Sequence, residues 1–181
     1  MRTLPPLALA AALAATLLLT ACEDDESSAD NAGNADRPGG SACALDDLGV
    51  EVGAGAAPAA GDTGSVTVTL TNNGAPCTLK GFPAVDLVAD DGKASVPADQ
   101  PGQAADAQSL PLTKGATASF TITYVRGEAG GAQSLPARKA SFGLPGATAT
   151  HDMTWSYGEV ALKGEEGEPE ATVSAFQTAG D

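Results

Sequence analysis

Apolar and polar residues alternate with a period of two in several short segments, and this pattern restricts the fold most. In residues 66–71, apolar side chains alternate with threonines. The clearest segment is residues 118–124, where one face of an extended strand would carry Ala118, Phe120, Ile122 and Tyr124. Its other face would carry Ser119, Thr121 and Thr123. Apart from the apolar run at the N-terminus, no long window repeats apolar residues at helical spacing, so the pattern predicts half-buried β-strands.

Turn signals separate these segments from further strand candidates. Asn72 to Pro76 and Asp90-Asp91-Gly92 are typical turn sequences, and the second predicts a hairpin. The other predicted strands are residues 82–88, 94–96, 139–142, 148–155, 160–162 and 172–176, with Leu110-Pro111-Leu112 leading into the strand at 118–124. About seven or eight short strands with one apolar face each predict an all-β fold, an antiparallel sandwich of two sheets.

The first 22 residues indicate export and lipid attachment. Arg2 precedes a run of Leu and Ala over residues 7–19, which is shorter than the ~20 apolar residues of a spanning helix. The run closes with Leu19-Thr20-Ala21-Cys22, which resembles the lipobox of bacterial lipoproteins. We therefore expect a signal peptide over residues 1–21 and a lipid on Cys22. Ordinary cleavage after Ala21 is the alternative.

Residues 22–42 are expected to form a lipidated, disordered acidic linker, followed by the β-sandwich domain over residues 43–178. Residues 23–41 contain six acidic residues, one arginine and no large apolar residue, a composition that does not support a packed core. The whole chain has a net charge of −14. Removing Arg2 with the signal leaves 8 basic and 23 acidic residues, a net charge of −15. Such a surface repels nucleic acid and anionic headgroups, so we expect membrane contact through the lipid alone.

The chain has three cysteines, an odd number that needs an explanation in an exported protein. If Cys22 carries lipid, Cys43 and Cys77 remain as one pair in an oxidising compartment. We expect them to form a disulfide that supplements a core with few aromatic residues. Two reduced, buried thiols are the alternative.

A longer series of residues resembles a known family. Cys43, residues 70–85 (LTNNGAPCTLKGFPAV) and residues 112–118 (LTKGATA) resemble an uncharacterised domain of actinobacterial lipoproteins, defined as a domain of unknown function. The resemblance covers roughly residues 43–125 and implies an immunoglobulin-like sandwich outside the cytoplasm, with no assigned activity. Residues 126–176 match loosely, and a second cysteine pair that members often carry there is missing. The family brings no catalytic residues to transfer.

Few residues of the sequence are candidates for catalytic groups or metal ligands. His151 and Met153 would share a strand face with Trp155, and a His-x-Met pair is typical of Cu(I) carriers. After loss of Met1, however, one His and one Met remain, so we expect Met153 and Trp155 to face the core with His151 at its rim. An undetected hydrolase would need His151 as its base, and no Gly-x-Ser-x-Gly occurs. The acid doublets Asp46-Asp47 and Asp90-Asp91 do not form opposed pairs. Calcium remains an alternative through oxygen ligands at Asp90 and the acidic residues Glu165, Glu166, Glu168 and Glu170.

The sequence thus predicts a non-catalytic binding or interaction domain without a cofactor, anchored by lipid on the outer face of the cell membrane. Its partner would be an envelope protein, a cell-wall polymer or a small ligand. The expected contact surfaces are the loops at residues 97–109, 126–137 and 163–170, because they are long and lie at strand ends. A metal-handling lipoprotein using His151 and Met153 is the first alternative, and a hydrolase is the second.

Overall fold

The structure is a computed structural model that describes residues 40–100, 108–164 and 167–179. These residues form antiparallel β-sheets and one short 3-10 helix, η1 (Leu45–Asp47), and no α-helix occurs among them, which confirms the all-β fold class. No helix in the described part of the chain is long and apolar enough to cross a membrane. The strands are β1 (Leu48–Val52), β2 (Thr63–Asn72), β3 (Cys77–Lys80), β4 (Ala84–Ala89), β5 (Gly92–Val96), β6 (Ser109–Leu112), β7 (Thr117–Val125), β8 (Ser134–Leu135), β9 (Lys139–Gly143), β10 (Thr150–Thr154), β11 (Val160–Lys163), β12 (Glu168–Pro169), β13 (Ala171–Val173) and β14 (Gln177–Thr178).

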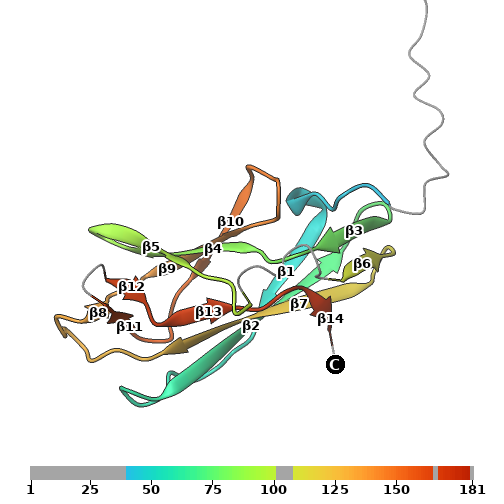
Figure 1. The fold of residues 1–181 in the computed structure, drawn as a ribbon. Coiled ribbons are helices and arrows are strands. Elements are labelled where there is room, and N and C mark those ends of the chain that lie inside the picture. The colour runs from blue at the N-terminus through green and yellow to red at the C-terminus, as the bar shows by residue number, and fades with distance from the viewer. Residues whose placement is uncertain (1–39, 101–107, 165–166, 180–181) are drawn as a thin grey trace, which may run out of the picture. The chain divides into compact units, whose positions relative to one another are not determined.

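The larger sheet has the order β1-β2-β7-β13, and β14 also pairs with β7 (Figure 1). β2 and β7 pair over nine residues in a register that sets Val68 opposite Phe120. The apolar residues predicted to share one face of β7 are all buried, at 2% exposure or less. Ser119, expected on the outer face, is buried as well, because strands pair with it on both sides, at Thr69 and Gln177.

The second sheet has the order β10-β9-β4-β5 and lies above the first in Figure 1. β4 and β5 form the predicted hairpin, in which Ala89 pairs with Gly92. Phe142 of β9 meets Phe120 of β7 with ring centroids 5.1 Å apart, so the two sheets share one aromatic core. This packing confirms the antiparallel sandwich.

Two small sheets complete the fold, with orders β12-β11-β8 and β3-β6. The sequence pattern did not predict β1, β3 or the two-residue strands. Two predicted loops are also more ordered than expected. β12 pairs with β11 inside the acidic segment, and the Asp99 amide donates to the Val173 carbonyl (2.9 Å).

The predicted disulfide between Cys43 and Cys77 is confirmed. The two sulfurs are bonded, and the residues are 6% and 8% exposed. Beside it, the Cys43 amide donates to the Thr78 carbonyl (3.1 Å) and the Thr78 amide donates to the Ser41 carbonyl (2.9 Å). The chain segment before β1 is therefore fixed to β3 covalently and by hydrogen bonds.

Candidate functional site

The one histidine lies on β10 at the rim of the core. Met153 and Trp155 are 6% and 4% exposed and face inward, while the half-buried ring of His151 packs on Phe142 with centroids 5.4 Å apart. The Met153 sulfur would have to leave the core to bind a metal together with His151. In the described part of the chain, no three His, Cys, Asp or Glu side chains gather as a metal-binding group.

His151 also lacks the neighbours that a catalytic base needs. Among residues 40–100, 108–164 and 167–179, no hydrogen bond joins its side chain to a serine or a carboxylate. The adjacent Asp152 carboxylate accepts instead from the Lys139 ammonium group (2.7 Å). This hydrogen bond lowers the pKa of Asp152 below its usual value.

The described acidic residues considered for calcium do not gather into a metal-binding group. The Asp90 carboxylate lies 3.1 Å from the Arg138 guanidinium. Glu168 and Glu170 are exposed, and Glu165 and Glu166 lie outside the described residues. The doublet Asp46-Asp47 is exposed on η1.

One predicted contact loop, 126–137, and the last residue of another, Glu170, line a hollow of about 650 Å³, which we call the loop groove. The segments 126–137 and 163–170 both contribute to it, together with Gly61 and β11. The residues lining it are Gly61, Val125, Arg126, Gly127, Glu128, Gly131, Ala132, Gln133, Ser134, Ala161, Leu162 and Glu170. The loop at 97–109 does not line the groove, and its residues 101–107 lie outside the described ones.

Arg126 is the central charged group of the loop groove, and the sequence interpretation missed it. Its Nη1 donates to the Pro58 carbonyl (2.5 Å), while its Nε is buried without a hydrogen-bond partner. Gly158 packs against this side chain so closely that a Cβ there would lie 2.6 Å from Nε. The available signal was an arginine directly after the clearest strand, in a chain with few basic residues.

The loop at residues 126–137 is held in place by Glu159. Both oxygens of this carboxylate accept from the Gly130 amide, at 3.0 and 3.1 Å. The Gly131 amide donates to the Glu128 carbonyl (3.0 Å), and the Ser134 amide donates to the Gly131 carbonyl (3.1 Å). These bonds fix the loop backbone, so the groove is preformed and does not depend on the ligand to order it.

The loop groove has a mixed polar and apolar lining, and small residues make up much of it. Glycine and alanine occupy positions 127, 131, 132 and 161 of the lining, and of these only Gly127 is buried. Its charged lining residues are the exposed Glu128 and Glu170 and one arginine, Arg126, so carboxylates outnumber cationic side chains. This arrangement suits a ligand rich in N–H, hydroxyl or ammonium groups.

Cys22 and the boundaries predicted for the signal peptide lie outside the described residues, as does most of the predicted linker at 22–42. Their assignment stays a prediction from the sequence.

Comparison with known proteins gives one match. The sequence model of a family described as "Domain of unknown function (DUF4232)" matches residues 43–177. No curated protein and no solved structure matches the chain.

Proposed function

Because the chain belongs to the DUF4232 family, a domain family without an assigned function, we propose a role from its own residues. The protein is a lipoprotein anchored on the outer face of the cell membrane. Its β-sandwich binds an envelope partner in the loop groove and does not catalyse a reaction. The observation that carries this proposal is the hollow that the loop 126–137, including Arg126, lines together with Glu170 of the segment 163–170.

Several features support a binding role rather than catalysis. The groove is preformed by Glu159, and ligand sites in proteins are mostly preformed hollows of about 300–1,000 Å³. The only histidine packs on Phe142 and belongs to a different part of the sandwich from the groove. The net charge of the mature chain and the free carboxylates of Glu128 and Glu170 favour a partner segment that carries positive charge.

The disulfide between Cys43 and Cys77 supports the proposed lipid anchor on Cys22. Cys43 and Cys77 are bonded to each other, so Cys22 has no partner left in the chain. It ends an apolar export segment with the Leu-Thr-Ala-Cys sequence of a lipobox. Two acyl chains would hold the domain at the membrane, whereas a single chain binds only marginally.

Partner binding is tested by capture from solubilised cell envelope with the lipidated protein. Replacing both groove carboxylates, Glu128→Gln with Glu170→Gln, is expected to reduce the recovered partner about tenfold, equivalent to ~1.4 kcal/mol. The matched control is Glu168→Gln, since Glu168 is exposed on β12 but does not line the groove. Equal recovery by the double variant and the unchanged protein would show that the groove is not the binding site.

The anchor is tested by mass spectrometry of protein extracted from membranes. An acylated Cys22 at the N-terminus is the expected result. A protein beginning at residue 22 with a free thiol would refute the anchor, whatever the outcome of the binding test.

A further inference from the structure

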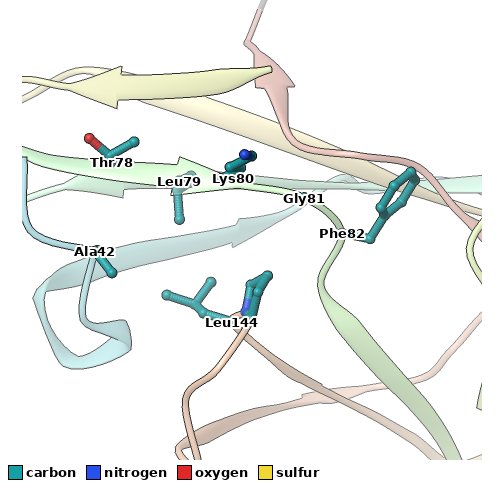
Figure 2. A pocket seen from close by; sticks show the side chains of 8 residues that line it. Ala42, Thr78, Leu79, Lys80, Gly81, Phe82 and Leu144 are labelled. Carbon is teal, nitrogen blue, oxygen red and sulfur yellow. The ribbon is translucent and has the colours of Figure 1, made fainter. Parts of the chain in front are cut away.

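A second hollow, of about 380 Å³, lies at the start of the sandwich, and we call it the apolar slot (Figure 2). It is lined by Ala42, residues 78–82 of β3 and the following turn, and Leu144-Pro145 after β9. In Figure 2, Leu79 is directed toward Leu144 across the slot, whereas Thr78 and Lys80 point to the opposite side of β3.

The slot is more apolar than the loop groove. Its floor consists of Leu79 and Leu144, which are 2% and 4% exposed. The half-buried Phe82 and the exposed Ala42 and Pro145 form its walls. Among the described residues no carboxylate lines it, and the side chain of Lys80, its one charged lining residue, points to the opposite side of β3 in Figure 2, so the slot is suited to an uncharged apolar group.

The slot also lies where the N-terminal segment joins the domain. Ala42 forms a parallel bridge with Thr78, and the disulfide fixes Cys43 beside it. Nineteen residues lie between Cys22 and Ala42, and a flexible polar chain of that length would span about 25 Å on average. A group attached to Cys22 is therefore present near the slot at an effective concentration of about millimolar.

From these observations we infer that the apolar slot binds one acyl chain of the lipid on Cys22 of the same molecule whenever no bilayer is present to take it. The inference rests on the proposed lipid anchor. A bilayer buries both acyl chains in full, but the slot covers only part of one. The lipid consequently leaves the slot when the protein reaches a membrane, and the slot shelters it in water.

The test uses full-length protein produced in cells fed with a diazirine-bearing fatty acid, so that the lipid itself carries the photoreactive group. The protein is irradiated in detergent-free buffer, and cross-linked peptides are mapped by mass spectrometry. We expect cross-links from the lipid on Cys22 to residues 78–82 and 144–145. Addition of phosphatidylcholine vesicles before irradiation should reduce these cross-links at least tenfold.

Variants identify the slot itself. Ala42→Glu and Pro145→Glu each place a charge at its mouth, and both positions are exposed, so the fold should tolerate them. Each is expected to reduce the cross-links about tenfold, whereas Ala60→Glu, an exposed alanine outside the slot, should leave them unchanged. Circular dichroism verifies that all three variants are folded.

The remaining outcomes overturn the inference. Absence of the photoreactive acyl group from Cys22 refutes the anchor and the inference together. If Cys22 is acylated, cross-links at other positions refute the slot alone.

In mixtures of unlabelled and ¹⁵N-labelled protein, cross-links found only between chains would assign the slot to a second copy. Cross-links formed only from photoreactive phosphatidylcholine in the vesicles would assign it to a membrane lipid.

Discussion

Asn72 is fully buried at the end of β2, and each polar atom of its side chain has a partner. Its Nδ2 donates to the carbonyls of Ala75 (2.9 Å) and Leu112 (3.0 Å), and its Oδ1 accepts from the Gly74 amide (2.9 Å). One side chain thus shapes the turn after β2 and joins it to β6. Asn72 lies within residues 70–85, on which the family resemblance rests.

Replacing Asn72 with alanine would leave two carbonyls and one amide without these partners. Because unpaired buried groups are costly, we expect the free energy of unfolding to fall by about 2–4 kcal/mol. The neighbouring Asn73 is exposed, so Asn73→Ala should change it by less than about 0.5 kcal/mol. Urea denaturation of both variants measures the difference, and equal effects would contradict this role of Asn72.

Asp86 of β4 makes a pH-dependent contribution to the free energy of unfolding. Hydrogen bonds from the side chains of Lys93 and Ser95, both 2.6 Å, lower its pKa from the usual value of 3.8. A lowered pKa in the folded state stabilises the fold above pH 3.8, and this contribution disappears as the pH falls below that value. The pair is partly exposed, so the contribution is about 0.2–1 kcal/mol.

Asp86→Asn should have a lower free energy of unfolding than the unchanged protein. We expect this difference at pH 7 and expect it to vanish as the pH is lowered through the range below 3.8. Thermal unfolding at a series of pH values measures it. A difference that stays constant across the series would assign the effect to packing rather than to the carboxylate.

At the scale of elements, the pairing of β2 with β7 depends on a glycine. Gly64 lies opposite Tyr124, and a Cβ at residue 64 would lie 2.7 Å from the Tyr124 ring. The ring has little freedom to move, because its hydroxyl donates to the Tyr157 carbonyl (2.8 Å) and it packs edge-on against Trp155. The tyrosine ring covers the glycine and completes this end of the sheet.

Gly64→Ala is therefore expected to lower the free energy of unfolding by about 1–3 kcal/mol through overpacking. Gly92 in the β4–β5 hairpin is the matched control, since nothing lies within 4 Å of a Cβ there. Gly92→Ala should have an effect of less than about 1 kcal/mol. Thermal unfolding compares the two variants, and a Gly64→Ala protein as stable as the control would show that the ring moves aside.

Local patterns predicted some elements and missed others for a physical reason. β2 and β7 are long and alternate strictly, so their buried faces are evident from the residues alone. β3 has four residues and pairs with β6, which follows about thirty residues later in the chain. Short strands of this kind are stabilised by distant partners, and a local window does not contain them.

At the scale of the whole molecule, the disulfide closes a loop that contains all of β1 and β2. The cysteines are 34 residues apart, and a loop of this size restricts the unfolded chain by roughly 3–4 kcal/mol. The same link holds the end of the predicted linker against β3. A pull on the N-terminal segment would thus reach β3 before it reached β1.

Replacing both cysteines, Cys43→Ala with Cys77→Ala, should lower the free energy of unfolding by roughly 2–4 kcal/mol. Chemical denaturation of this variant, and of the unchanged protein with and without a reducing agent, tests the value. The double variant should no longer respond to the reducing agent. An unchanged stability in the variant would mean that the bridge adds nothing to the sandwich.

The sequence by itself determined the all-β class, the buried faces of β2 and β7, the hairpin at Asp90 to Gly92 and the pairing of Cys43 with Cys77. These features depend on a two-residue period, on turn residues that are neighbours in the chain, or on counting cysteines. Only the tertiary structure decided the sheet order, the position of Arg126 against Gly158, the loop groove and the apolar slot. Each of these arises where segments distant in the chain pack together, and their packing depends on shape and contacts across the whole core.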